Sequence, residues 1–226
     1  MATTTLTAPK AAEPEPRLIL TRIGWDQYVA ISDALPERSD LRMIYVDGRL
    51  TLLSPSQQHD WVSECLGLLV IAVASGCGLV WEPAGSTTFR RKDQRGGVEG
   101  DKTFYFGEHA EQMIGQRKID FSTQSPPDLA IEVEVSHSAD DSMLVYGRLG
   151  VPEVWRVDLT RETTGFWLRQ DDGTYAATER SLALPLLEPG DIIGQLRLAE
   201  ELVTSRWHAQ LDGWVRDVLL PRREGA

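Results

Sequence analysis

Three acidic side chains fall on one face of a predicted strand and are the first candidates for chemistry. Residues 128–136 alternate aliphatic residues with Asp128, Ala130, Glu132 and Glu134. Side chains of a strand point to opposite faces with a period of two, so one face is aliphatic and the other acidic. Neighbouring carboxylates repel each other unless a cation lies nearby. That cation is either a divalent metal or an Arg or Lys from elsewhere in the chain.

A fourth acid, Asp101, lies near the beginning of a strand predicted at 98–106. Adjacent strands lie about 4.8 Å apart. Asp101 and Glu132 on neighbouring strands could therefore share one Mg²⁺ or Mn²⁺ ion. Asp128 lies about 13 Å from Glu132 along its own strand, at about 3.3 Å per residue. We therefore expect Asp128 to cap the strand entrance instead.

Structural interpretations of these acids remain open. Asp101 and Glu132 could pair with Lys102, Arg148 or Arg156 without forming a metal site.

Three further polar residues near the predicted strands also allow two interpretations each. Glu134 is either an outer metal ligand or part of a solvated strand face. His59 is either a polar residue at a helix start or a catalytic base. His137 either caps the next helix or contacts a substrate phosphate.

The composition limits the class of protein. The chain has 226 residues, 42% of them hydrophobic and 25% charged, which fits a globular protein of ordinary size. We expect a tail without fixed structure at 1–16 and a single domain at 17–226. Its core would span about 41–160, with a C-terminal extension at 161–226.

The composition also indicates where the protein is located and which partners it could bind. No apolar run reaches about 18 residues, so no membrane span is predicted. Only Cys65 and Cys77 are present, without a ligand cluster, and no secretory signal is recognised. We therefore expect a cytoplasmic protein without a disulfide or zinc site. A net charge of −11 argues against tight nonspecific DNA binding but does not exclude a nuclease with an acidic metal site. The basic cluster at 90–95 is either a solvated loop tip or a phosphate-binding loop.

The predicted elements would bring the acids together. Apolar residues at 62, 65, 66, 69 and 73 follow a helical period, and Asp47-Gly48 is a strong hairpin signal. The middle of the chain runs in the order helix, strand, strand, strand, helix, strand. The expected elements are helices at 23–34, 57–75, 140–149 and 198–219, hairpins at 42–53 and 165–178, and strands at 79–82, 86–90, 98–106, 128–136 and 154–158.

Four blocks of the sequence resemble a known family. They are the hairpin at 45–56, Val98–Tyr105, Pro127–Val133 and Gly150–Asp158. In this order, over roughly 20–200, they resemble the Uma-type restriction endonucleases, a bacterial family of the PD-(D/E)xK nuclease superfamily. The resemblance implies an α/β fold with a restriction-endonuclease-like αβββαβ core and a mixed sheet. An N-terminal helix and hairpin and a C-terminal hairpin and helix would flank this core.

The resemblance also implies roles for individual residues. Asp101 would be the aspartate of the second motif and Glu132 the acidic residue of the third, and both would bind Mg²⁺. His59 and Glu64 match polar positions of the preceding helix. The metal would polarise a phosphoryl oxygen and lower the pKa of a bound water, and a lysine would normally orient that water.

The sequence departs from the family pattern in two places. Gly100 stands where the family has proline. The lysine is missing, because Glu134 stands two residues after Glu132 and Ser142 stands four residues before Tyr146. Neither Lys102, expected on the opposite strand face from Asp101, nor Arg148 is an evident substitute.

Two functions therefore remain in view. The first is a Mg²⁺-dependent DNA endonuclease, weak or inactive because it lacks the lysine. The second is a noncatalytic module of the same fold for binding or assembly, formed as a homodimer through exposed strand edges or the C-terminal helix. The retained Asp101 and Glu132 favour the first, while the missing lysine and the net charge favour the second.

Overall fold

Strand β8 (Leu129–Glu134), which carries the acidic face, lies inside a mixed sheet. The computed structural model describes residues 15–35, 41–85, 88–116 and 124–223. Within these ranges, β8 pairs antiparallel with β7 (Lys102–Phe106) and parallel with β9 (Glu153–Asp158). This central sheet has the order β11-β10-β9-β8-β7-β4, with β4 at Trp81–Pro83, β10 at Thr163–Arg169 and β11 at Tyr175–Thr178.

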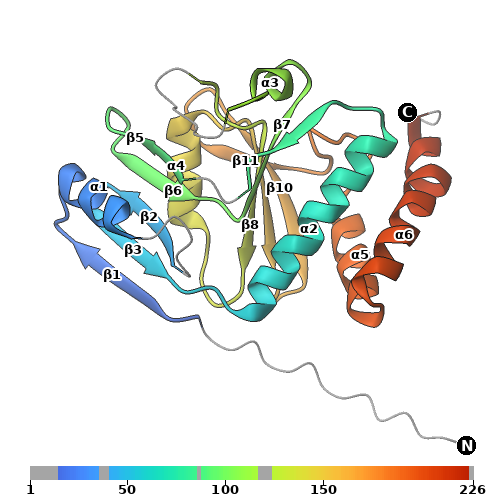
Figure 1. The fold of residues 1–226 in the computed structure, drawn as a ribbon, viewed down its shortest axis with the longest axis horizontal. Coiled ribbons are helices and arrows are strands. Elements are labelled where there is room, and N and C mark those ends of the chain that lie inside the picture. The colour runs from blue at the N-terminus through green and yellow to red at the C-terminus, as the bar shows by residue number, and fades with distance from the viewer. Residues whose placement is uncertain (1–14, 36–40, 86–87, 117–123, 224–226) are drawn as a thin grey trace, which may run out of the picture.

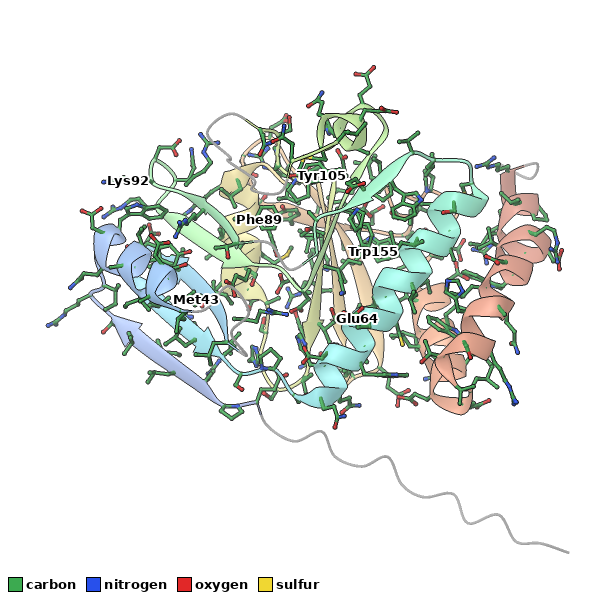
Figure 2. The ribbon with its side chains drawn as sticks, in the orientation of Figure 1. Met43, Glu64, Phe89, Lys92, Tyr105 and Trp155 are labelled. Atoms are coloured by element: carbon green, nitrogen blue, oxygen red, sulfur yellow. The ribbon has the colours of Figure 1, made fainter. Side chains whose placement is uncertain are left out.

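Helices cover the aliphatic face of β8 (Figure 1). Leu129, Ile131 and Val133 are buried in one apolar cluster with Trp155. Trp155 is labelled beside helix α2 (Gln57–Gly76) in Figure 2. The helix α2 begins where predicted because the Ser56 hydroxyl accepts the His59 N–H at 3.1 Å, which caps its first turn. The covering helices are α2 (Gln57–Gly76), α5 (Pro189–Glu201) and α6 (Thr204–Trp214).

The acidic face of β8 is covered by α4 (Asp140–Leu149). Figure 1 shows α4 between the central sheet and a second, N-terminal sheet. Ala130 of β8 packs with Val145 and Tyr146 of α4 in an apolar cluster that extends into the N-terminal sheet. Because α4 covers this face, Glu132 and Glu134 are buried rather than solvated. The N-terminal sheet has the order β1 (Arg17–Thr21), β3 (Arg49–Leu53), β2 (Arg42–Val46), β6 (Gly96–Glu99), β5 (Thr88–Arg91).

The N-terminal sheet contains the predicted hairpin. Asp47 and Gly48 have φ angles of 47° and 86°, the left-handed pair that a tight hairpin turn requires. The predicted first helix is α1 (Trp25–Ala34), whose Tyr28 stacks on Tyr45 of the sheet with ring centroids 4.7 Å apart. The edge strand β1 was not predicted. It pairs with β3 through the main chain rather than through a distinctive side-chain pattern.

The predicted strand at 98–106 is wrong as one element. The chain ends β6 at Glu99 and starts β7 at Lys102, because β6 pairs with the N-terminal sheet and β7 with the central sheet. Gly100 and Asp101 form the crossing between the two sheets. A Cβ atom at Gly100 would lie 2.5 Å from the Tyr146 hydroxyl, so glycine lets Tyr146 approach the crossing.

The predicted closing helix at 198–219 is also wrong as one element. Its first turn belongs to α5, which already starts at Pro189, and the extended backbone at Leu202 and Val203 separates α5 from α6. The break lets both helices place apolar residues against the α2 side of the core. A π-helical turn (Val215–Leu219) and a 3₁₀ turn (Leu220–Arg223) follow α6.

Some of the remaining predictions are confirmed, and others fall partly outside the described residues. The helix at 140–149, the strand at 154–158 and the second hairpin are confirmed, and a short helix α3 (Gly107–Gln112) follows β7. Residues 1–14 of the expected tail and 86–87 of an expected strand lie outside the described residues. Glu15 and Pro16 are described, and Glu15 is buried. In the described part of the chain, no helix combines the length and apolar character needed to cross a membrane.

Candidate active site

Asp101 and Glu132 line one small buried cavity where α2, β8 and the N-terminal sheet meet. The cavity volume is about 20 Å³, which holds about one water molecule or a bare cation. The two acids that the sequence placed on neighbouring strands therefore do come together. The other polar or charged residues that line the cavity are Glu15, Arg42, His59, Glu99 and His137.

Asp101 is held from two directions. Its Oδ2 accepts the Val133 N–H at 2.8 Å and lies 3.2 Å from Nε2 of His59. Its Oδ1 lies 4.0 Å from Nε of Arg42. The cations near Asp101 are thus His59 and Arg42, and not Lys102, Arg148 or Arg156 as the structural alternative supposed.

Glu132 lies 8% exposed beneath α4. The Tyr146 hydroxyl donates to its Oε1 at 2.5 Å. Burial, followed by the negative charge of Asp101, raises the pKa of Glu132 to about 8. The Tyr146 hydrogen bond opposes this rise without cancelling it. Glu132 is therefore largely protonated near neutral pH unless a cation joins the cavity.

His59 and Arg42 bring positive charge to the cavity. Burial lowers the pKa of His59, but its hydrogen bond to Asp101 and the charges of Asp101, Glu15 and Asp60 outweigh burial and raise it to about 9. His59 therefore holds Asp101 as an imidazolium, which fits a positioning role better than that of a base. Nδ1 of His59 and Nε of Arg42 are buried and have no hydrogen-bond partner among the described residues.

Glu15 enters the cavity from the segment before β1, and its side chain is 1% exposed. Its Oε1 accepts the Ser56 N–H at the start of α2, at 2.9 Å. Its Oε2 lies 3.5 Å from Nδ1 of His137, and its own N–H donates to the Ser136 hydroxyl at 3.0 Å. His137 faces Glu15 at the cavity instead of capping α4, whose N-cap residue is Ala139. Its contact with a substrate phosphate stays a prediction.

Glu134 does not join the cavity. Its Oε1 lies 2.5 Å from Nε of Arg156 and accepts the Ala139 N–H at 3.1 Å. Arg156 also contacts Asp140 and lies over the Trp167 ring, 5.7 Å from its centroid. Glu134 is therefore a buried ion-pair residue that joins β8 to the start of α4, rather than an outer ligand or a solvated side chain.

Two other acids also lie away from the cavity lining. Glu64, labelled on α2 in Figure 2, is exposed and pairs with Lys102 at 2.6 Å. Asp128 accepts the Phe106 N–H at 2.7 Å and contacts Nδ1 of His109 at 2.7 Å. Asp128 thus ties the start of β8 to β7, as expected for a residue that caps the strand. Within the described ranges, no group of three or more His, Cys, Asp or Glu side chains is arranged to hold a metal ion.

The model of the Uma2 family, described as putative restriction endonucleases, matches residues 25–201. The chain belongs to this family. The match includes Arg42, His59, Asp101, Glu132 and His137 of the cavity but not Glu15.

A solved structure supports the fold. The crystal structure of a putative nuclease belonging to DUF820 from Anabaena variabilis is similar to this chain with a TM-score of 0.50 and 14% identity. The similarity covers 75% of this chain and 96% of that one. At this identity the likeness concerns the fold. No curated protein matches the sequence.

Ser142, where the sequence resemblance led us to expect a lysine, lies beside Glu132. Ser142 of α4 is fully buried, and its hydroxyl favours the ionised form of Glu132, although it makes no hydrogen bond of standard geometry among the described residues. A side chain at position 142 therefore points toward the same carboxyl group that Tyr146 contacts. Serine supplies no positive charge there.

Sequence reasoning missed Arg42 and Glu15. Arg42 could have been found as the cation that opens the apolar strand 42–46, but Glu15 gave no signal because it follows a stretch rich in Ala, Pro and Glu. The basic cluster at 90–95 contains ion pairs of Arg90 with Asp33 and of Lys92 with Asp26. Lys92 lies at the outer edge of the molecule in Figure 2, which fits a solvated loop tip.

Proposed function

We propose that this protein is a slow, metal-dependent DNA endonuclease that hydrolyses phosphodiester bonds at the Asp101–Glu132 cavity. The observation that carries the proposal is that these two acids, which come from two different family blocks, line one buried cavity. Burial and the negative charge of Asp101 raise the pKa of Glu132, so two ionised carboxylates are unfavourable there, and a divalent cation would remove that cost.

The donor set fits Mg²⁺ or Mn²⁺. Val133 and His59 engage Oδ2 of Asp101, and Tyr146 engages Oε1 of Glu132. Oδ1 of Asp101 and Oε2 of Glu132 would then be the oxygens that hold the metal. Mg²⁺ in phosphoryl-transfer sites commonly takes one or two carboxylates and completes its coordination with water and substrate phosphate. A cation there would polarise a phosphoryl oxygen and make a nearby water more acidic.

The protein side chains have separate tasks in this proposal. His59 holds Asp101 in place, and Tyr146 fixes the rotamer of Glu132. Arg42 lies on the Oδ1 side of Asp101 and would neutralise charge that develops on the phosphate. Arg42 thereby takes part of the role of the absent lysine, but it does not contact Glu132 as a side chain at position 142 would.

Plasmid cleavage tests the proposal. Supercoiled plasmid is incubated with purified protein in Mg²⁺, in Mn²⁺ or in EDTA, beside the variants Asp101→Asn and Glu132→Gln. We expect slow nicking with metal, none in EDTA, and a loss of at least about a hundredfold in either variant. Glu64→Gln, which alters an exposed acid on α2, is the matched control. Cleavage that persists in EDTA or in Asp101→Asn would rule out this site.

The second candidate is a noncatalytic relative that binds DNA or assembles through the same fold. The serine at position 142 favours it, because loss of an electrostatic catalyst can cost several orders of magnitude in rate. Calorimetry separates the two candidates. Metal binding that is lost in Asp101→Asn supports the endonuclease, and the absence of metal binding supports the module.

A further inference from the structure

The carboxylate of Glu15 fills a position built from donors of two separate segments. The main-chain N–H of Ser56 at the start of α2 donates to one oxygen, and His137 after β8 faces the other. The Ser136 hydroxyl holds the Glu15 main chain beside them. The groups that surround the Glu15 carboxylate are therefore hydrogen-bond donors of the kind that bind anions.

These groups have the chemistry of a phosphate site. The α2 helix has 20 residues, so its first turn presents main-chain N–H groups and the positive end of a full-length helix. A second feature of the same cavity is an unused donor of a cationic side chain. Nε of Arg42 is buried and has no hydrogen-bond partner in the described part of the chain, and it lies 4.0 Å from Oδ1 of Asp101.

We propose that Ser56, Ser136 and His137 form a binding site for a phosphate group of the DNA backbone, and that Glu15 occupies this site in competition with the substrate. The proposal rests on the proposed function, because the phosphate would be bound beside Asp101 and Glu132. Beyond the proposed function, it assigns the position of the phosphate and the role of Glu15 in blocking that position. A carboxylate and a phosphate oxygen accept the same hydrogen bonds, so one replaces the other without rebuilding the site.

Glu15 must leave before a substrate enters. The cavity of about 20 Å³ has no room for a phosphate beside the Glu15 side chain. A ligand that binds only the open form has its apparent affinity reduced by the fraction of open molecules. Glu15 lies outside the residues that match the family model, so this competition belongs to the N-terminal segment of this chain.

Inorganic phosphate tests the site without any hydrolysis. Full-length wild type, Glu15→Ala and Glu15→Gln are heated with and without phosphate, in Mg²⁺ and in EDTA. We expect phosphate to raise the Tm of Glu15→Ala by about 3 °C more than that of wild type, because the vacated site binds it. The control is Glu108→Ala, which removes an exposed acid in the first turn of α3. An equal response of all the proteins would overturn the proposal.

A second measurement locates the bound phosphate. The double variant Glu15→Ala with His137→Ala should lose the gain, since His137 belongs to the site and Glu15 no longer occupies it. An undiminished gain would place the phosphate elsewhere and contradict the proposal. Glu15→Gln keeps an oxygen for the Ser56 N–H without the negative charge, so it remains informative if Glu15→Ala does not fold. We expect its gain in Tm to lie between those of wild type and Glu15→Ala.

Oligonucleotide binding extends the test to DNA. A short fluorescent duplex in EDTA should bind Glu15→Ala about tenfold more tightly than wild type, by anisotropy. This readout is independent of cleavage. Tight binding without cleavage supports the Glu15 site and counts against the endonuclease, whereas cleavage with unchanged binding supports the endonuclease and counts against the Glu15 site.

Discussion

Glu132 and Glu134 lie two residues apart on the same face of β8, but their surroundings differ. Glu134 has an Arg156 partner on the adjacent strand β9, and it accepts the Ala139 N–H from the segment that starts α4. Glu132 has the Tyr146 hydroxyl and faces Asp101, and it forms no ion pair within the described residues. The strand thus carries one neutralised carboxylate and one whose charge is disfavoured.

This difference separates structural from functional acidity. A buried charge that has a hydrogen-bonded partner serves the fold, and removing the partner is costly. A buried acid whose pKa is raised by burial and by a second acid is unfavourable in its ionised form, and a proton or a bound cation relieves that cost. Three predictions test this contrast.

The first prediction removes the partner of Glu134. Arg156→Ala leaves the buried Glu134 without its cation, and we expect the free energy of unfolding to fall by about 3 kcal/mol. Urea unfolding at pH 7 measures the change. Arg197→Ala, which breaks an exposed pair with Glu162, is the control and should cost less than about 1 kcal/mol. If both variants lose the same amount, Glu134 is not a structural ion-pair residue.

The second prediction concerns pH and Glu132. The raised pKa means that the folded protein keeps a proton on Glu132 that the unfolded chain releases above its ordinary pKa of 4.5. Stability should therefore fall as pH rises from about 5 to 8, by up to about 1.4 kcal/mol per pH unit. His59, with its pKa raised to about 9, contributes in the same direction, but only above its ordinary value of 6.5.

The slope due to Glu132 is therefore best isolated between pH 5 and 6.5. Urea unfolding in EDTA should show that Glu132→Gln lacks this part of the decline. Glu134→Gln should retain it, because Glu134 already has its cation. A wild-type profile parallel to that of Glu132→Gln would mean that Glu132 ionises normally.

The third prediction gives Glu132 a cation of its own. Ser142→Lys places an ammonium group beside Glu132, and we expect metal-dependent cleavage to rise by about tenfold. Ser142→Met has a similar length without the charge and is the matched control for crowding in the fully buried position. An equal rate in the Lys and Met variants would show that the missing charge does not limit the reaction.

Much of the fold could be predicted because local signals agree with it. Asp47-Gly48 specifies its turn, and the apolar stripe of α2 specifies which side is buried. The crossing at Gly100 and Asp101 could not be predicted, since two short strands in different sheets look like one strand at 98–106. The helix break at Leu202 was equally hidden, because apolar residues continue on both sides of it.

Asp101, Glu132, His59 and His137 could be named from the sequence and do line the cavity, but Glu15 and Arg42 could not. Asp101 and Glu132 stand in recognisable blocks, whereas the partner of each acid depends on packing between distant segments. Glu134 looked similar to Glu132 in the sequence, and only the position of Arg156 on the adjacent strand distinguishes them. Glu15 approaches the cavity from more than 80 residues away in the chain from Asp101, a distance over which side-chain spacing carries no information.

The crossing at Gly100 and Asp101 also anchors both acids of the site in one sheet. Asp101 directly precedes β7, whose Lys102 pairs with Ile131 of β8, and its Oδ2 accepts the N–H of Val133. Arg42, in contrast, belongs to β2 of the N-terminal sheet. A shift of one sheet against the other would therefore move Arg42 relative to the two carboxylates without separating them. Because a misplacement of about 1 Å can cost roughly a hundredfold in rate, the proposed reaction would be sensitive to how firmly the two sheets are held together.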